Sequence, residues 1–115
     1  MSEAPRKVPV VFYRTAGGNE VVLEWLRALD IEDQYAIGQD LQRVQFRWPI
    51  GMPLCRSLGK GLWEVRTNLT SKRIARLYFF FDATRLVVVH GIIKKTQRTP
   101  KSELDLAYGR KREFE

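Results

Sequence analysis

The N-terminal part of the chain shows one strand pattern followed by two helical patterns. Val8–Tyr13 is rich in β-branched and aromatic residues, so we expect a short strand that ends before the Gly17-Gly18 turn. Asn19 is a suitable N-cap for a following helix. The apolar positions of that helix fall on one face and are Val22, Trp25, Leu26 and Leu29.

A second helix is expected to begin at Asp30 or Ile31. Its apolar positions, at spacings of two to four residues, are Tyr35, Ile37, Leu41 and Val44. Gly38 interrupts this stripe and lowers the helical propensity of the segment. The next residues, Arg47–Gly61, contain two prolines and three glycines, which predicts a loop.

The hydrophobic period then changes to two, which predicts three successive strands. These strands are expected at Leu62–Thr67, Arg73–Asp82 and Leu86–Ile93. The polar links between them, Asn68–Lys72 and Asp82–Arg85, are short, and short links join antiparallel neighbours.

A last helix is expected after Thr99, because a threonine cap followed by Pro100 is a favourable helix start. Its narrow apolar face consists of Leu104, Ala107 and Tyr108. These elements predict an α+β fold in which an antiparallel sheet carries helices over one face. The 115 residues fit one domain, and no repeat or linker divides them.

Side-chain alternation brings polar residues to one face of this sheet. In the middle strand, the core face is expected to carry Ala75, Leu77, Phe79 and Phe81, and the other face Ile74, Arg76, Tyr78 and Phe80. The residues that then share the second face are Glu64, Arg66, Arg76 and Tyr78, with either Lys94 or Lys95 from the next strand. The aromatic rings suggest a concavity where bases stack. The structural alternative is a solvated face on which Glu64 pairs with one of the arginines.

The distribution of charge strengthens the case for a polyanionic partner. The chain has a net charge of +7, and residues 56–115 hold fourteen basic against six acidic side chains, whereas residues 1–55 are nearly balanced. Such a field favours nucleic acid ahead of an acidic protein. With no apolar signal segment or membrane span, and with Cys55 as the only cysteine, we expect a cytoplasmic protein without disulfides or membrane contact.

Other chemistries lack the residues that they need. His90 is the single histidine, which leaves no histidine-based metal cluster, and we interpret it as a hydrogen-bonded sheet residue. A serine–histidine–acid triad would need this same histidine and a nucleophile motif that the chain lacks. The glycines at 17–18 and 59–61 match no phosphate-binding or dinucleotide-binding motif. We therefore expect no metal and no other cofactor.

Three segments of the chain carry a family resemblance. They are GLWEVR at 61–66, RIARLYFF at 73–80 and HGIIKKTQRTP at 90–100, of which the last is the most specific. With the expected N-terminal strand and helices, they resemble the HigB-type toxins, the phage-derived-protein branch of the RelE/ParE toxin superfamily. The resemblance implies a RelE-like fold, with two N-terminal helices packed on one face of an antiparallel sheet and a short C-terminal helix.

The resemblance also implies an activity and partners. Such toxins typically cleave mRNA in the A site of the small ribosomal subunit, and a helix-turn-helix (HigA-like) antitoxin neutralises them. Arg76 matches the central-strand arginine that contacts the scissile phosphate, and Arg66 matches a basic residue on the preceding strand. Lys94 and Lys95 fall where the superfamily places further basic or aromatic groups, and Tyr78 lies beside Arg76 on the same face.

Metal-independent RNA cleavage needs a base for the attacking 2′-hydroxyl, charge stabilisation at phosphorus and an acid for the leaving 5′-oxygen. Arg76 and Arg66 suit the stabilising role, because a planar guanidinium matches phosphate oxygens. Glu64 is the candidate base, with a lysine of lowered pKa as the alternative, and Lys94 or Lys95 is the candidate acid. We expect Arg76→Ala to abolish cleavage with little change in thermal stability.

Further basic residues are candidates for contacts with the RNA backbone, which set affinity rather than base choice. They are Lys60, Lys72, Arg73, Arg98 and Lys101. Two other functions remain compatible with the sequence. One is a non-catalytic protein of the same fold that binds RNA, the ribosome or an acidic partner, and the other is a toxin that poisons gyrase.

Overall fold

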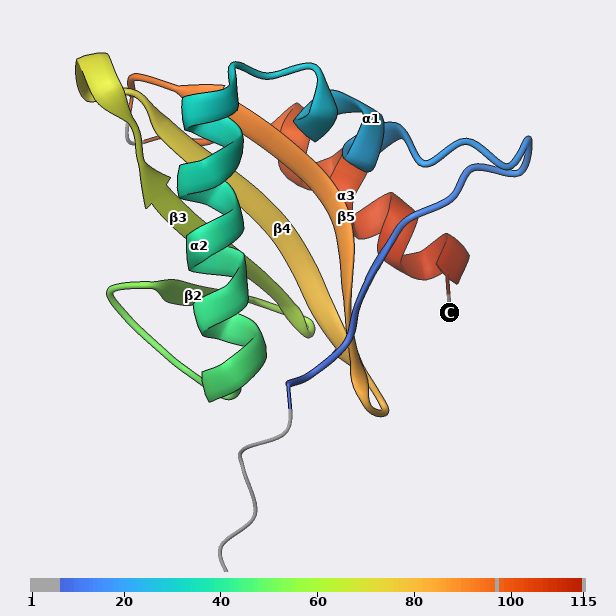
Figure 1. The fold of residues 1–115 in the computed structure, drawn as a ribbon. Coiled ribbons are helices and arrows are strands. Elements are labelled where there is room, and N and C mark those ends of the chain that lie inside the picture. The colour runs from blue at the N-terminus through green and yellow to red at the C-terminus, as the bar shows by residue number, and fades with distance from the viewer. Residues whose placement is uncertain (1–6, 97, 115) are drawn as a thin grey trace, which may run out of the picture.

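The computed structural model of this chain describes residues 7–96 and 98–114. A five-stranded sheet with the order β1-β5-β4-β3-β2 organises these residues (Figure 1). The strands are β1 (Val10–Phe12), β2 (Cys55–Gly59), β3 (Leu62–Asn68), β4 (Ile74–Asp82) and β5 (Arg85–Lys94). The helices are α1 (Val21–Arg27), α2 (Ile31–Arg47) and α3 (Lys101–Phe114), with a 3-10 turn η1 (Thr70–Lys72).

The sheet is mixed rather than wholly antiparallel. β2, β3, β4 and β5 pair as antiparallel neighbours, as the short links between the last three predicted. β1, in contrast, lies parallel to β5, with Val10 opposite Leu86. A parallel neighbour needs a long crossover, and the two N-terminal helices are part of the connection that provides it.

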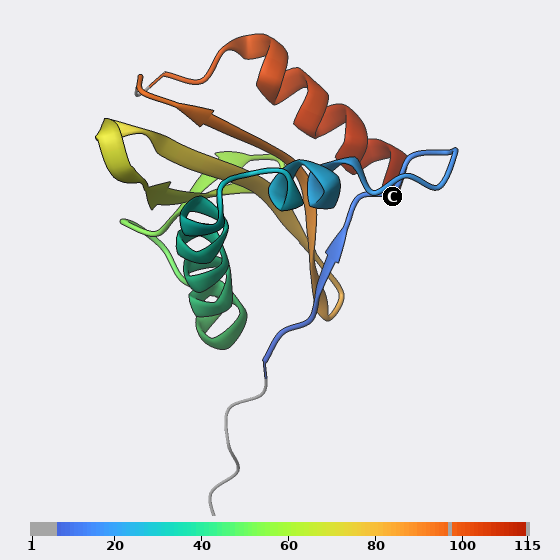
Figure 2. The ribbon, with the colours of Figure 1, turned by 45° about the horizontal axis from the view of Figure 1, so that its top comes forward.

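Helices cover both faces of the sheet. Figure 2 shows α1 and α2 on one side of the strands and α3 on the other. The α+β class and the packing of the two N-terminal helices on one face are therefore confirmed, and α3 lies on the opposite face rather than beside them. The physical reason lies in β4 and β5, which are buried on both faces. A sheet with two apolar faces needs a layer of helix over each.

The two faces support separate cores. On the α2 side, the largest fully buried apolar side chains include Ile37, Val44, Leu77, Phe79 and Val88. On the α3 side, the buried residues are Tyr13, Leu62, Tyr78, Phe80, Val87, Val89, Ile92 and Ala107. Two expected core residues lie at the surface instead, since Tyr35 is 68% exposed and Phe81 is 41% exposed.

The segment Arg47–Gly61, expected to be a loop, contains the edge strand β2. Cys55 pairs with Val65 and Arg56 with Glu64, and a bulge between Ser57 and Gly59 interrupts the register. Cys55 lies in the α2-side core. Burial raises the pKa of its thiol to about 12, so it is an inert apolar residue rather than a reactive one.

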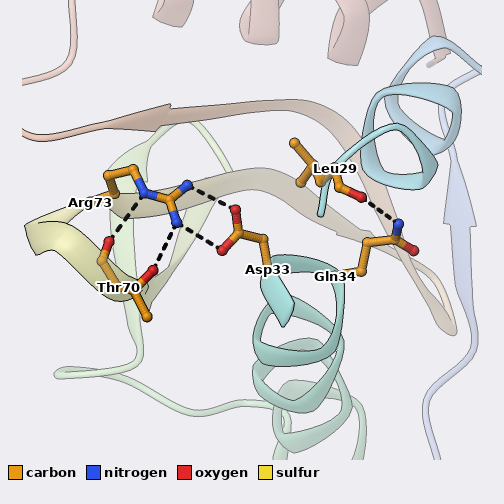
Figure 3. A network of polar contacts seen from close by, with 5 residues as sticks. All are labelled: Leu29, Asp33, Gln34, Thr70 and Arg73. Atoms are coloured by element: carbon orange, nitrogen blue, oxygen red, sulfur yellow. Dashed lines mark hydrogen bonds and ion pairs between the residues drawn. The ribbon is translucent and has the colours of Figure 1, made fainter. Parts of the chain in front are cut away.

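A polar network joins the start of α2 to the start of β4 (Figure 3). The Arg73 guanidinium donates to both carboxylate oxygens of Asp33, at 2.8 and 3.0 Å, and also to Thr70 Oγ1 at 3.1 Å. Gln34 Nε2 donates to the Leu29 carbonyl at 2.7 Å and ties α2 to the end of α1. The hydrogen bond from Arg73 holds the pKa of Asp33 below its ordinary value. Arg73 is therefore engaged in the fold.

The predicted helix starts are accurate to about two residues. The N-cap of α1 is Glu20 rather than Asn19, and α2 begins at Ile31 as expected. α3 begins at Lys101, and its inner face carries Leu104, Ala107 and Tyr108, which confirms the predicted apolar face. None of the helices in the described residues is long and apolar enough to span a membrane.

Candidate nucleic-acid interface

Strand register brings the predicted site residues together on the α3 side of the sheet. Glu64 lies opposite Tyr78, and Arg66 lies opposite Arg76. Their neighbours Val65 and Leu77 point to the α2-side core, which confirms the alternation. The predicted grouping of these four residues on one face is therefore present in the fold.

A β-bulge in β5 decides which residues of that strand join this face. The register slips by one residue at Val89, so Tyr78 faces His90 whereas Phe79 faces Val88. Without the slip, His90 would point to the α2 side with Val88. The bulge places His90 and Lys94 on the α3 side, with Lys94 opposite Ile74. Lys95 follows the end of the strand, in an exposed bend.

Arg76 lies at the centre of this face and is 0% exposed. Its Nη1 donates to Thr99 Oγ1 and its Nη2 to the Thr96 carbonyl, each at 2.9 Å. The segment that leads into α3 thus covers the guanidinium. RNA phosphate reaches Arg76 only if this segment moves, and the predicted phosphate contact stays a prediction. The expected thermal stability of Arg76→Ala needs correction, because the truncation leaves a buried cavity and polar groups without their donor.

The open concavity expected around Tyr78 and Phe80 is not present. Tyr78 is 0% exposed and Phe80 is 3% exposed, because α3 packs over both. The Tyr78 hydroxyl lies 3.0 Å from Thr99 Oγ1, and its ring stacks on His90 with 6.0 Å between centroids. Burial raises the pKa of Tyr78 above its ordinary value, although the contact with Thr99 opposes this shift.

Glu64 and Arg66 form an ion pair at the rim of this face. Arg66 Nε lies 3.5 Å from Glu64 Oε1, and the two side chains are 23% and 5% exposed, respectively. Arg66 also lines a cavity of about 630 Å³ at the edge of β3, together with Arg43 and Arg47. Of the two predicted arginines, only Arg66 therefore reaches the surface. It is therefore the one of the two that is accessible to a ligand.

Several residues of this face were not predicted as site residues. His90 Nε2 pairs with Glu103 on α3, and Arg110 Nη1 donates to the Val89 carbonyl at 2.9 Å. Thr99 joins Arg76 to Tyr78, as described above. Arg56 lies opposite Glu64 on β2, which was not recognised as a strand. His90 was correctly interpreted as a hydrogen-bonded sheet residue, but its partner on α3 has no sequence signal.

Most of the remaining basic candidates gather at one end of the sheet. β3 ends, β4 begins and β5 ends there, since Ile74 pairs with both Asn68 and Lys94. The exposed cations at this end are Lys72, Lys95 and Arg98. We call these three residues, with Arg66 and Lys94, the basic end of the sheet. In Figure 1 it lies at the upper left, where η1 meets the segment before α3.

The other three candidates are placed differently. Lys60 lies in the turn before β3, at the opposite end of that strand and roughly 20 Å away. Lys101 Nζ pairs with Asp105 at 2.9 Å on the outer surface of α3. Arg73 holds Asp33 through two hydrogen bonds. Of these three, only Lys60 lies at the far end of the strand, whereas Arg73 and Lys101 are held in ion pairs, and their RNA contacts stay predictions.

The chemistry of the described residues is that of an arginine- and lysine-rich surface. Residues 7–96 and 98–114 contain no group of three or more histidine, cysteine or acidic side chains arranged to hold a metal ion. Arg66, Arg76 and Lys94 are donors of the kind that bind phosphate oxygens. Glu64 is the carboxylate that pairs with Arg66.

Comparison with known proteins identifies a family for most of the chain. Residues 24–112 match the family described as Phage derived protein Gp49-like. This family includes RelE/HigB-like toxins and is associated with toxin–antitoxin systems. No curated protein matches the chain. The match covers α2, all the strands from β2 to β5 and most of α3. The chain therefore belongs to the family of Gp49-like phage-derived proteins.

Proposed function

We propose that this protein is the toxin of a type II toxin–antitoxin pair and that it cleaves mRNA in the ribosomal A site. Its partners are the mRNA, the small ribosomal subunit and a helix-turn-helix antitoxin of the HigA type. The family match supports the toxin class. The observation that carries the proposed activity is the placement of Arg66 and Arg76 on adjacent strands, opposite one another, beside the basic end of the sheet.

RNA binding begins at the exposed part of this surface. Lys72, Lys95 and Arg98 attract the phosphate backbone, and Arg66 takes the scissile phosphate at the rim. Arg76 then exchanges its present acceptors for phosphate oxygens. Two of those acceptors, the Thr99 hydroxyl and the Thr96 carbonyl, are uncharged. A phosphate carries a full negative charge and can accept two parallel hydrogen bonds from the planar guanidinium, so it favours the exchange that uncovers Arg76.

The chemical step is a metal-independent transesterification. The 2′-oxygen attacks the adjacent phosphorus and gives its proton to Glu64, while Arg66 and Arg76 stabilise the charge on the phosphorane. The bond to the 5′-oxygen breaks, and Lys94 or Lys95 protonates the leaving oxygen. The products are a 2′,3′-cyclic phosphate and a 5′-hydroxyl. Tyr78 lies beside these groups and positions Thr99 and His90.

A second function is favoured by the burial of the same residues. Arg76 and Tyr78 have no exposed surface, and the Glu64 side chain is only 5% exposed. If the segment before α3 never opens, the basic end of the sheet still binds RNA or ribosome but cannot cut. The protein would then block translation without cleavage.

The test adds the purified chain to ribosomes that translate a defined mRNA and maps the new 5′ ends by primer extension. We expect cuts within A-site codons, 5′-hydroxyl ends and no cuts in naked mRNA. Arg76→Lys should fold, because it keeps a buried positive charge, and should lose cleavage, because it lacks the planar fork.

Other outcomes separate the remaining functions. If translation were inhibited while the mRNA stayed intact, the protein would be a non-catalytic RNA- or ribosome-binding protein rather than an endonuclease. Intact mRNA and unaffected translation, with loss of DNA supercoiling by gyrase, would replace it by a gyrase toxin. Growth arrest on expression, relieved by the neighbouring helix-turn-helix gene, tests the toxin class independently of the target.

A further inference from the structure

The outward face of α2 carries a stripe without charged residues. The stripe consists of Ile31, Tyr35, Gly38, Gln42 and Phe46, which follow one another at spacings of three or four residues. Ile31 is 76% exposed, Tyr35 68% and Phe46 46%. We call these five residues the α2 stripe. In a chain with 29% charged residues, an exposed helical surface of this kind indicates a binding surface.

The α2 stripe lies opposite the side of α2 that packs on the sheet. Ile37, Leu41 and Val44 face the core, and Asp33 near the start of the helix is bound to Arg73. In Figure 1, α2 lies in front of the sheet with its outer side toward the viewer and no other element over it. No other helix or strand of the described chain therefore covers the stripe, although Lys7 Nζ lies 5.9 Å from the centroid of the Phe46 ring.

Gly38 lies in the middle of the stripe, and the fold of one chain does not require it. A Cβ atom at this position would meet nothing within 4 Å. Glycine nevertheless weakens a helix interior. What it provides is a notch in a shallow groove of about 380 Å³, lined also by Ile31, Tyr35 and Gln42. Such a notch lets the backbone of a second helix approach closely.

The residues of the α2 stripe are placed symmetrically about a point near its middle. Ile31 and Phe46 are equidistant from the point between residues 38 and 39, and so are Tyr35 and Gln42. An antiparallel copy centred on that point places each member of these pairs opposite the other. Gly38 then meets Gln39 of the partner at the crossing. This is the self-complementarity that a two-fold interface requires.

The charges beside the stripe favour the same arrangement. Glu32, Arg43 and Arg47 lie on one flank, within roughly 60° of one another around the helix. In an antiparallel pair, equal flanks meet, so Glu32 falls along the axis within about 3 Å of both the partner's Arg43 and the partner's Arg47. In a parallel two-fold pair, opposite flanks meet instead, so Glu32 would have neither Arg43 nor Arg47 of the partner beside it. Arg43 also contacts Asp40 of its own chain at 2.6 Å, which leaves further guanidinium donors for the partner.

We propose that the α2 stripe is a self-association surface, on which two copies of this chain pair α2 against α2, antiparallel, around a two-fold axis beside Gly38. The pairing buries Ile31, Tyr35 and Phe46 of both copies. It leaves α3, on the other face of the sheet, accessible, and it does not depend on the proposed function.

Sedimentation velocity of the full chain between about 1 and 200 µM tests the proposal. We expect a species of twice the 13.4 kDa monomer mass to form as the concentration rises. Tyr35→Glu should weaken dimerisation at least tenfold, and so should Gly38→Leu, which fills the notch without a clash inside one chain. Leu106→Glu is the control, because Leu106 is 41% exposed on α3, far from the stripe.

Charge-reversal variants distinguish the antiparallel dimer from non-specific association. Glu32→Arg should weaken the dimer, and addition of Arg43→Glu with Arg47→Glu should restore it. Circular dichroism establishes that each variant is folded. A monomer at all concentrations would overturn the proposal. So would a dimer that Leu106→Glu weakens as much as Tyr35→Glu, or a folded triple variant that does not recover.

Discussion

Gly91 is a residue at which β5 has no space for a side chain. A Cβ atom there would lie 2.6 Å from Trp25 Cζ3 and 2.8 Å from Leu77 Cδ2. Because the bulge turns Gly91 toward α1, the indole of Trp25 packs directly on its backbone. The glycine is thus what allows α1 to approach the sheet closely.

We expect Gly91→Ala to lower the free energy of unfolding by about 1–3 kcal/mol, since both neighbours must move. Urea denaturation followed by tryptophan fluorescence measures the change. Gly51→Ala is the matched control, because a Cβ atom there meets nothing within 4 Å. Equal stabilities of the two variants would show that α1 does not pack on β5 in this way.

The Asp33–Arg73 pair predicts a pH dependence of stability. The pKa of Asp33 is lowered in the folded chain, so the pair contributes most when the pH is above the unfolded carboxyl pKa of about 3.9. This contribution is lost as the pH falls through the lower folded pKa. Asp33→Asn should therefore destabilise the protein at pH 7 and destabilise it less at pH 3.

Denaturant midpoints of wild type and variant at the two pH values provide the measurement. Asp105→Asn is the control, since its exposed partner Lys101 contributes little at any pH. If the difference in denaturant midpoint between wild type and Asp33→Asn were the same at pH 3 as at pH 7, the assigned ion pair would be contradicted.

At the scale of elements, α3 is the layer that closes the candidate site. Ala107, on the inner face of α3, is 0% exposed. The Tyr108 hydroxyl donates a hydrogen bond to the Leu58 carbonyl at 2.8 Å. Ala107→Leu should lift α3 from the sheet, because the larger side chain has no space there. Amide hydrogen exchange should then accelerate in Lys101–Phe114 and remain slow in Ile31–Arg47. Leu106→Ala, one position away and exposed, should change neither helix.

The sequence predicted the elements whose patterns are regular. β3, β4 and β5 alternate clearly, and their predicted bounds agree with the structure within one residue. β2 was missed because Cys55–Gly59 is an edge strand with exposed residues and a bulge. Its polar, glycine-containing sequence has no alternation to detect.

That α3 covers the face expected to be open was not predicted, and the reason lies in β4. Both faces of this strand carry aromatic residues, with Phe79 on one side and Tyr78 and Phe80 on the other. That pattern marks a strand buried on both faces, but Arg76 within it suggested an open, charged face. The bonds from Arg76 to Thr96 and Thr99 explain how a guanidinium is accommodated there. Contacts of this kind between distant segments leave no local pattern.

At the scale of the molecule, the surfaces have separate roles. The α2 stripe lies on one side of the sheet, and α3 with the candidate site lies on the other (Figure 2). The basic end of the sheet lies where the strands β3 and β5 end, next to η1. A dimer through α2 would thus carry α3 of each copy on the far side of its sheet.

The rate of mRNA cleavage by an Arg66→Ala variant tests the central claim most directly. Arg66 is the site arginine that reaches the surface, with its side chain 23% exposed. Loss of one such donor at the transition state typically lowers the rate roughly 10²–10³-fold. With saturating protein on translating ribosomes, we predict a loss of this size for Arg66→Ala. Arg27→Ala, exposed on the α2 side, should cleave within about twofold of the wild-type rate. A folded Arg66→Ala variant that cleaves at the wild-type rate would contradict the account.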